Sequence, residues 1–177
     1  MPVTRRRHRP ISVPAVTASV AALLLGGCFG EPEGPDSAAG TRVVGEELEY
    51  WLGGECSNVT AIDVDLRDEK RATLDRWSVT ATGGVAATVE TFTAGVGPAG
   101  FSETDPLEVD VSEADIAIAT ISRTDGGDPV EVVAQVADLV ADPAPHDNAW
   151  RLVYRGWTAD DDVRDLIGEG ELAPACD

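Results

Sequence analysis

The sequence predicts an all-β protein: an antiparallel β-sandwich, immunoglobulin-like in the broad sense, with one short helix near the C-terminus. Three observations lead to this fold class. Apolar and polar residues alternate with a period of two in several short segments. These segments are rich in valine, isoleucine, threonine and tryptophan, and turns that contain glycine or proline separate them. About seven or eight such strands suit a sandwich, and a partly open barrel is the alternative arrangement.

The first half of the domain contains four expected strands, at 48–52, 59–67, 74–82 and 86–93. The first of them extends back to Val43 at most. The second shows the pattern most clearly, because Ile62, Val64 and Leu66 face one way while charged residues face the other. The glycine pair at 53–54 is expected to end the first strand, and the glycine-rich stretch after the fourth strand, 95–100, is expected to be a loop.

The second half contains three further expected strands, at 107–111, 115–122 and 150–157. The last of these places Trp150, Leu152 and Tyr154 on one face. Between the strands, 125–128 has the composition of a hairpin turn, with two glycines between two aspartates. The segment 142–148 is rich in proline and polar residues, so we expect a loop there.

The stretch 130–140 has features of both a strand and a helix. Asp128 and Pro129 supply the N-cap and the first-position proline that are typical of a helix start. Valines that alternate with other residues from Val130 onwards favour a strand instead. The sequence therefore favours a strand here, with a helix as the alternative.

The segment 158–168 has the pattern of a short helix. Thr158 or Asp160 is expected to cap its N-terminus, and acidic residues fill its first turn. Apolar residues recur three and four positions apart within it, which places them on one face. Gly168 is expected to end the helix.

The first 28 residues have the three parts of an export signal. A basic head with four arginines precedes the charge-free run 11–25, and Gly26 and Gly27 stand directly before Cys28. The charge-free run is shorter than the roughly 20 apolar residues that span a bilayer. Export through the general secretory route and through the twin-arginine route both remain open, because Arg5 and Arg6 form an arginine pair.

The stretch Leu25-Gly26-Gly27-Cys28 resembles the lipobox of bacterial lipoproteins. This resemblance implies that the signal peptide 1–27 is removed and that a diacylglycerol is attached to the sulfur of Cys28. The segment 28–40 is then a lipidated cysteine with a flexible tether, rich in glycine, proline and acidic residues. The β-sandwich domain covers 41–177 and lies on the extracytoplasmic face of the cell membrane. Around 98–101 the chain is also similar to small lipoproteins of high-GC bacteria, for which no activity is known.

The charge of the chain restricts its partners. The formal net charge is −19, and removing the four arginines of the basic head leaves −23 for the residues from Cys28 onwards. A surface this acidic opposes binding to nucleic acid and adsorption to an anionic membrane leaflet. We expect no nucleic-acid partner. We also expect a monomer that reaches the membrane through its N-terminal lipid, with an unidentified envelope protein or a glycan as its possible ligand.

The remaining two cysteines, Cys56 and Cys176, are expected to form a disulfide. Cys28 is assigned to the lipid, which leaves an even pair in an oxidising compartment. The bond would hold the C-terminal segment against the region around Cys56. A zinc site is not expected, because one histidine, His146, and a bonded cysteine pair offer too few ligands.

Catalytic motifs are missing from the mature sequence. It contains no G-x-S-x-G motif, and its one histidine, His146, lies in a proline-rich turn. The aspartates of 125–128 and 160–162 are candidate calcium ligands, but a turn and a helix cap explain them. Aromatic residues such as Trp77 and Trp150 suit the sandwich core better than a sugar-binding platform.

The sequence as a whole predicts a lipid-anchored envelope protein with a binding or structural role, no enzymatic activity and no cofactor. Two alternatives stay open. One is a hydrolase on the secreted side of the membrane that uses His146 or a pair of acids. The other is a module that binds calcium or a glycan.

Overall fold

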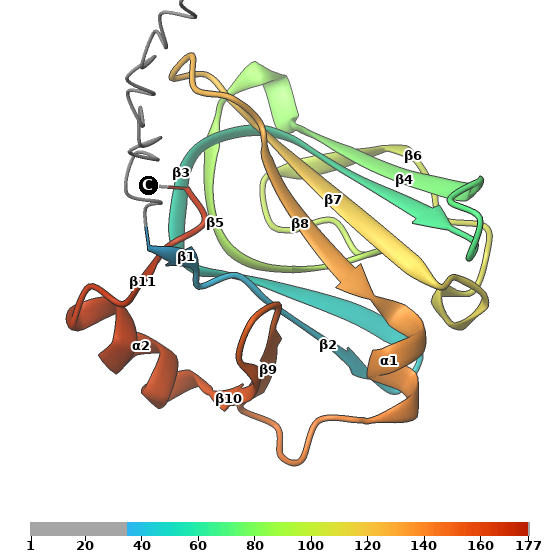
Figure 1. The fold of residues 1–177 in the computed structure, drawn as a ribbon. Helices are drawn as coiled ribbons and strands as arrows, with labels where there is room; N and C mark the ends of the chain where they lie inside the picture. The colour runs from blue at the N-terminus through green and yellow to red at the C-terminus, as the bar shows by residue number, and fades with distance from the viewer. Residues whose placement is uncertain (1–34, 177) are drawn as a thin grey trace, which may run out of the picture. The chain divides into compact units, whose positions relative to one another are not determined.

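The computed structural model describes residues 35–176, and its central element is one long strand, β3 (Glu47–Arg67) (Figure 1). The first half of β3 pairs with β2 (Gly40–Val44) and β5 (Ala87–Thr93). The second half pairs with β4 (Thr73–Ala81) and β7 (Ile116–Arg123). All four pairings are antiparallel, so β3 belongs to both layers of an antiparallel β-sandwich, and the predicted fold class is confirmed.

β3 bends where it passes from one layer to the other. Gly53 has a φ of +75° and Asn58 a φ of +62°, both in the left-handed region that glycine and asparagine tolerate best. The register between β3 and β5 shifts on both sides of Cys56, and such bulges bend a strand. The glycine pair at 53–54 was expected to end a strand. It lies inside β3 instead, where the strand bends.

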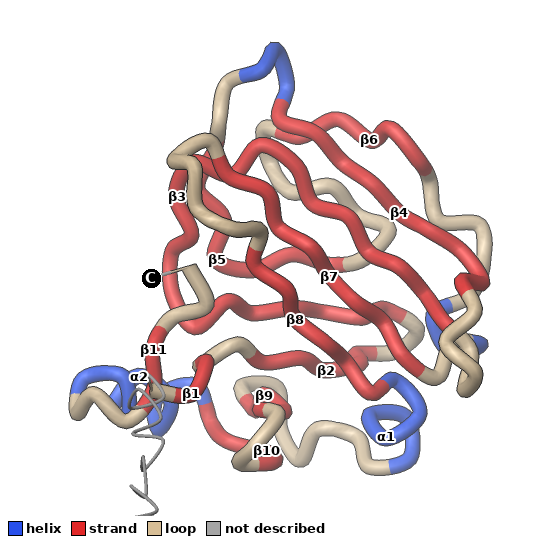
Figure 2. The backbone as a smooth tube through the Cα atoms, turned by 45° about the horizontal axis from the view of Figure 1, so that its top comes forward, coloured by secondary structure: helices blue, strands red, loops and turns tan. Residues whose placement is uncertain are grey.

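The other strands extend the two layers. The first layer has the order β10-β9-β2-β3-β5 and the second the order β8-β7-β3-β4-β6 (Figure 2). The bounds of these outer strands are Phe101–Asp105 for β6, Val130–Gln135 for β8, Ala149–Leu152 for β9 and Gly156–Ala159 for β10. A separate parallel pair joins β1 (Asp36–Ser37) to β11 (Leu172–Ala173).

Within the described residues, four short helical elements connect the strands. They are the 3₁₀ turns η1 (Thr82–Gly84) and η2 (Val111–Glu113) and the helices α1 (Val136–Ala141) and α2 (Asp160–Gly168). Neither they nor any other helix within 35–176 is long and apolar enough to cross a membrane.

The main core fills the space between the two layers. Side chains from the inner face of β3, including Leu48, Tyr50 and Ile62, are fully buried there. Tyr50 stacks on Phe92 with ring centroids 4.8 Å apart, and Trp77 lies 6.5 Å from the same phenylalanine. This packing confirms the predicted core position of Trp77. Burial also raises the pKa of the Tyr50 hydroxyl, because the ionised form has no water around it.

A second, smaller core lies on the outer face of the first layer, beneath α2. It contains Ala38, Trp51, Trp150, Leu152, Val163 and Leu172. Val163 is the buried residue of α2. The apolar face predicted for this helix therefore packs against the smaller core. Trp150 is 7 % exposed, so its predicted position in a core is also confirmed.

Most of the remaining predicted elements are present. The strands expected at 74–82, 86–93 and 115–122 correspond to β4, β5 and β7. The turn at 125–128 connects β7 and β8, which pair as a hairpin. The helix expected at 158–168 is α2, although its N-cap is Ala159, whose side chain offers no capping oxygen. Capping by Thr158 or Asp160 was therefore a wrong prediction.

The strand predicted at 107–111 is absent, and β6 lies just before it in the chain. The physical reason is that a carboxylate binds the backbone of this segment. Asp75 on β4 accepts hydrogen bonds from the backbone N–H groups of Glu108 (2.7 Å) and Val109 (2.8 Å). A side chain thus satisfies the donors that a neighbouring strand would otherwise have to pair.

Two further segments differ from their predictions. The stretch 130–140 is a strand only as far as Gln135, and α1 follows at once, so the strand and the helix each describe one half. The segment 150–157 is two strands, β9 and β10, which pair across a turn that ends at Gly156 with a φ of +74°. Tyr154 lies in this turn and is 75 % exposed, instead of facing the core.

The folded domain begins earlier than the expected boundary at 41. β1 starts at Asp36, and Ala38 and Gly40 are buried, because β11 and β9 pack against this stretch. The last residues assigned to the tether thus belong to the fold. The signal peptide and Cys28 lie outside the described residues.

Candidate functional site

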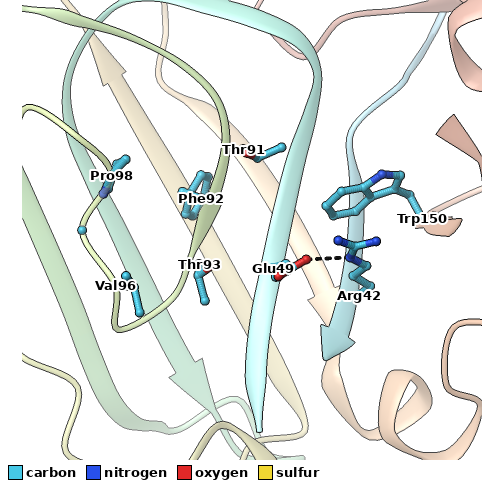
Figure 3. Close-up of a pocket in the computed structure, with 9 residues that line it drawn as sticks. Arg42, Glu49, Thr91, Phe92, Thr93, Val96, Pro98 and Trp150 are labelled. Carbon is cyan, nitrogen blue, oxygen red and sulfur yellow. Dashed lines mark hydrogen bonds and ion pairs between the residues drawn. The ribbon is translucent and has the colours of Figure 1, made fainter. Parts of the chain in front are cut away.

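The outer face of the first layer carries a cleft of about 330 Å³ (Figure 3). Side chains from β2, β3, β5 and β9 line it, and the loop after β5 forms its far wall. Strand alternation explains this composition. Leu48 and Tyr50 of β3 point into the core, so Glu49 between them points outwards into the cleft.

Arg42 on β2 is the most constrained side chain of the cleft. Its Nε donates to Oε2 of Glu49 at 2.6 Å, and its Nη1 donates to the backbone carbonyl of Asp147. Its guanidinium carbon lies 4.2 Å from the centroid of the Trp150 ring. Figure 3 shows the guanidinium between Glu49 and the indole. Three contacts from three elements therefore fix this cation in one position.

The aromatic contacts continue beyond Trp150. The rings of Trp150 and Trp51 have centroids 5.7 Å apart, and the guanidinium carbon of Arg164 on α2 lies 5.4 Å from the Trp51 ring. Arg42, Trp150, Trp51 and Arg164 thus form a column, which we call the Arg–Trp column. Both indoles are at least nine-tenths buried, and burial strengthens the attraction between a cation and an aromatic face.

Acidic side chains balance the outer end of the Arg–Trp column. Arg164 donates to Glu90 at 3.0 Å and to Asp160 at 3.0 Å, and Trp51 donates its indole N–H to Glu90 at 3.3 Å. The hydrogen bonds to Glu90 and Asp160 raise the pKa of Arg164. Asp160, one of the candidate calcium ligands, is therefore engaged with an arginine.

Gly40 makes the Arg–Trp column possible. A Cβ atom at this position would lie 2.7 Å from the Cβ of Trp150 and 3.2 Å from Cδ2 of Leu152. Only glycine allows Trp150 to cross β2 at this distance. The site therefore depends on a backbone position whose side chain is a single hydrogen.

The part of the cleft that remains open is polar and close to electrically neutral. Thr91 and Thr93 on β5, two residues with a hydroxyl group, line it, and Thr91 is exposed. The charges of Arg42 and Glu49 compensate each other. Hydroxyl groups both donate and accept hydrogen bonds, so this surface suits a neutral ligand with hydroxyl or amide groups.

The predicted disulfide between Cys56 and Cys176 is present, with the two Cα atoms 5.3 Å apart. Two hydrogen bonds hold the same segment in place. Ala175 donates its N–H to the carbonyl of Leu52 at 2.8 Å, and Arg123 donates to the carbonyl of Cys176 at 2.5 Å. The C-terminal segment is therefore fixed against the bend of β3.

The other candidate residues do not come together. His146 is exposed, and its side chain makes no hydrogen bond within 35–176. Asp125 accepts from the N–H of Gly127 at 3.1 Å and lies 3.4 Å from Arg123, as its turn requires. No three histidine, cysteine, aspartate or glutamate side chains of the described part are grouped to hold a metal.

Sequence reasoning missed Arg42, Glu49, Thr91 and Thr93. One signal was available for the first two: a Gly-Glu turn at 45–46 joins β2 to β3 and places Arg42 opposite Glu49 in the hairpin register. The threonines give no such signal, because they come to lie beside Glu49 only through the pairing of β5 with β3, which are far apart in the sequence. No family model, curated protein or solved structure matches this chain.

Proposed function

We propose that the protein is a lipid-anchored envelope protein on the extracytoplasmic face of the cell membrane, and that its sandwich acts by binding. The lipobox-like stretch Leu25-Gly26-Gly27-Cys28 supports the anchor. The disulfide between Cys56 and Cys176 supports an oxidising compartment, since such bonds are rare in the reducing cytosol.

The proposed binding site is the cleft beside the Arg–Trp column, and the proposed ligand is a neutral glycan. The observation that carries this proposal is the preorganisation of Arg42 by Glu49, Trp150 and Asp147 beside the hydroxyl groups of Thr91 and Thr93. Groups already held in place lose little entropy when a ligand binds. A glycan would hydrogen bond to these groups, because its own groups are hydroxyls and amides.

The alternative of a hydrolase gains no support from particular contacts. Within 35–176, the side chain of His146 has no hydrogen-bond partner that would orient it as a base. The cleft favours a binding protein, because Arg42 and Glu49 are held by each other, and Arg42 also by Asp147 and Trp150, beside an open surface.

A titration tests the binding proposal. The full-length protein in detergent micelles is mixed with an N-acetylglucosamine tetramer, and tryptophan fluorescence reports on Trp150 at the cleft. The proposal predicts a saturable change that Thr91→Val weakens by about tenfold, because one hydrogen bond is lost. Thr80→Val, the same change at an exposed position of β4, is the matched control. Equal titrations for the wild type and both variants, or no change at all, would rule out the cleft as the site.

A further inference from the structure

β8 forms the edge of the second layer. Among the described residues it pairs only with β7, over all six of its residues from Val130 to Gln135. In an antiparallel pair every second residue directs its N–H and C=O away from the partner. The outer side of β8 therefore presents a row of backbone groups that no other described strand pairs.

The sequence of β8 contains few of the features that normally protect such an edge. It has no lysine, glycine or proline, and Glu131 is its only charged residue. No bulge interrupts its register with β7. The edge is therefore straight enough to accept another strand.

Two cavities follow this edge. One, of about 240 Å³, lies between Glu131 and Val133 of β8 and the segment from Ser37, the last residue of β1, to Ala39. The other, of about 180 Å³, continues past Val133 towards α1. Val133 and Val153 line both cavities, so the two are contiguous. We call them together the β8 groove.

The walls of the β8 groove combine apolar surface with negative charge. Val133, Val153 and Tyr154 are 37 %, 66 % and 75 % exposed, so large apolar side chains face solvent here. Glu131 and Asp138 add two carboxylates. The one arginine of the groove, Arg151, lies 2.8 Å from Asp142, which is outside the groove and compensates its charge.

We infer that the β8 groove binds an extended, basic peptide segment of a partner protein, which pairs with β8 as an additional strand. Backbone groups of the peptide would pair with the open edge, and alternate side chains would point to the two sides. Apolar side chains would contact Val133, Val153 and Tyr154, and basic ones would lie near Glu131 and Asp138.

Charge selects this occupant over a second copy of the chain. Two copies of the chain from Cys28 onwards, each with a formal charge of −23, repel each other as they approach, whereas a basic segment is attracted. The groove and the cleft beside the Arg–Trp column share no lining residue. This inference therefore stands or falls independently of the glycan proposal.

The test uses a synthetic peptide, Lys-Val-Lys-Val-Thr-Val-Lys, and the full-length protein in detergent micelles. We expect saturable binding, measured by fluorescence anisotropy of the labelled peptide, and slower hydrogen exchange at alternate amides of β8. A peptide with two of the valines replaced by proline is the matched control, since proline lacks the N–H that strand pairing requires.

Three protein variants locate the site. Glu131→Lys and Val133→Arg should each weaken binding by about tenfold or more, because each adds a positive charge beside a basic peptide. Val85→Arg, at a position that is 72 % exposed near η1, should bind like the wild type. Hydrogen exchange of the wild type needs no variant, so it decides the question even if a variant fails to fold.

Several outcomes would overturn the inference. They are equal binding of the proline peptide, exchange protection outside β8, or no saturable binding. Protection of β8 that grows with protein concentration in the absence of peptide would assign the edge to a second copy instead.

Discussion

The guanidinium carbon of Arg42 lies 4.2 Å from the ring centroid of Trp150, although the two residues are far apart in the sequence. Backbone register brings them together. β2 pairs with β3 so that Arg42 is opposite Glu49, and β2 pairs with β9 so that Gly40 is opposite Leu152. The backbone pairing of the sheet therefore places the residues at one end of the Arg–Trp column next to each other.

The first prediction concerns Arg42. Arg42→Ala should destabilise the domain by about 1–3 kcal/mol, because it removes the stacking on Trp150 and the pairing with Glu49. The tryptophan emission should also shift to the red as Trp150 gains contact with water. Urea unfolding followed by fluorescence measures both effects. Arg155→Ala is the control, since the ion pair of Arg155 with Glu171 is exposed and worth about 1 kcal/mol or less. Equal losses in the two variants would contradict the importance of the column.

The second prediction concerns the close approach at Gly40. Gly40→Ala should cost about 1–3 kcal/mol, because the new Cβ would meet the Cβ of Trp150 at 2.7 Å. Gly168→Ala, at the end of α2, meets no atom within 4 Å and should be neutral or stabilising. Thermal unfolding of both variants checks this contrast. A Gly40→Ala protein as stable as the wild type would show that Trp150 moves aside freely.

The strands were largely predictable, because the alternation of apolar and polar residues is a local property that can be read from the sequence. Ile62, Val64 and Leu66 show it, and all three are buried in β3. The bend of β3 was not predictable in the same way. Glycines at 53–54 are equally compatible with the end of a strand and with a bend. Only the pairing of β5 with β3 on both sides of the glycines, at Trp51 and at Cys56, decides between them.

The candidate site was far less predictable than the fold. The cleft needs Arg42, Glu49, Thr93 and Trp150 from four strands, and it exists only once β2, β3, β5 and β9 are in register. The missed loop at 107–110 has a similar cause, because a distant carboxylate, that of Asp75, satisfies its backbone donors. The disulfide was predictable, since Cys56 and Cys176 were the only pair left.

The third prediction concerns acid. Burial raises the pKa of Asp75, but backbone N–H groups of Glu108, Val109 and Arg76 lower it more, so the folded pKa lies below 3.8. A carboxylate with a depressed pKa contributes stability above its unfolded pKa, and this contribution is lost as the pH falls through the folded pKa. The stability advantage of the wild type over Asp75→Asn should therefore be present at pH 7 and shrink below pH ~4.

Urea unfolding of both proteins from pH 7 to pH 3 measures this difference. At low pH the other carboxylates are protonated and repel each other less, which changes the stability of both proteins alike. Subtracting the stability of the variant from that of the wild type cancels this effect. Asp65, whose pKa burial raises but Arg76 and Arg67 lower more, should show the same direction in Asp65→Asn. An advantage that grows towards low pH would contradict the assigned hydrogen bonds.

The fourth prediction concerns the disulfide between Cys56 and Cys176, whose sequence separation is 120. In the chain-entropy model a loop of this size contributes about 5 kcal/mol, and measured effects are typically about 2–4 kcal/mol. Replacing both cysteines by alanine should therefore lower the melting temperature by roughly 5–20 °C. Calorimetry of the oxidised, reduced and double-alanine proteins checks this. If the reduced protein had the same melting temperature as the oxidised one, the hydrogen bonds of Ala175 and Arg123 would be enough to hold the C-terminal segment in place.

The central claim is that Cys28 anchors a binding domain at the outer face of the membrane. The most direct measurement is membrane fractionation of cells that express the wild type or Cys28→Ser, combined with intact mass of the purified protein. The wild type should be in the membrane fraction, with its mass raised by lipid on a chain that begins at Cys28. Cys28→Ser should appear in the soluble fraction or keep its signal peptide. A Cys28→Ser protein that has lost its signal peptide and still fractionates with membranes would contradict the lipid anchor.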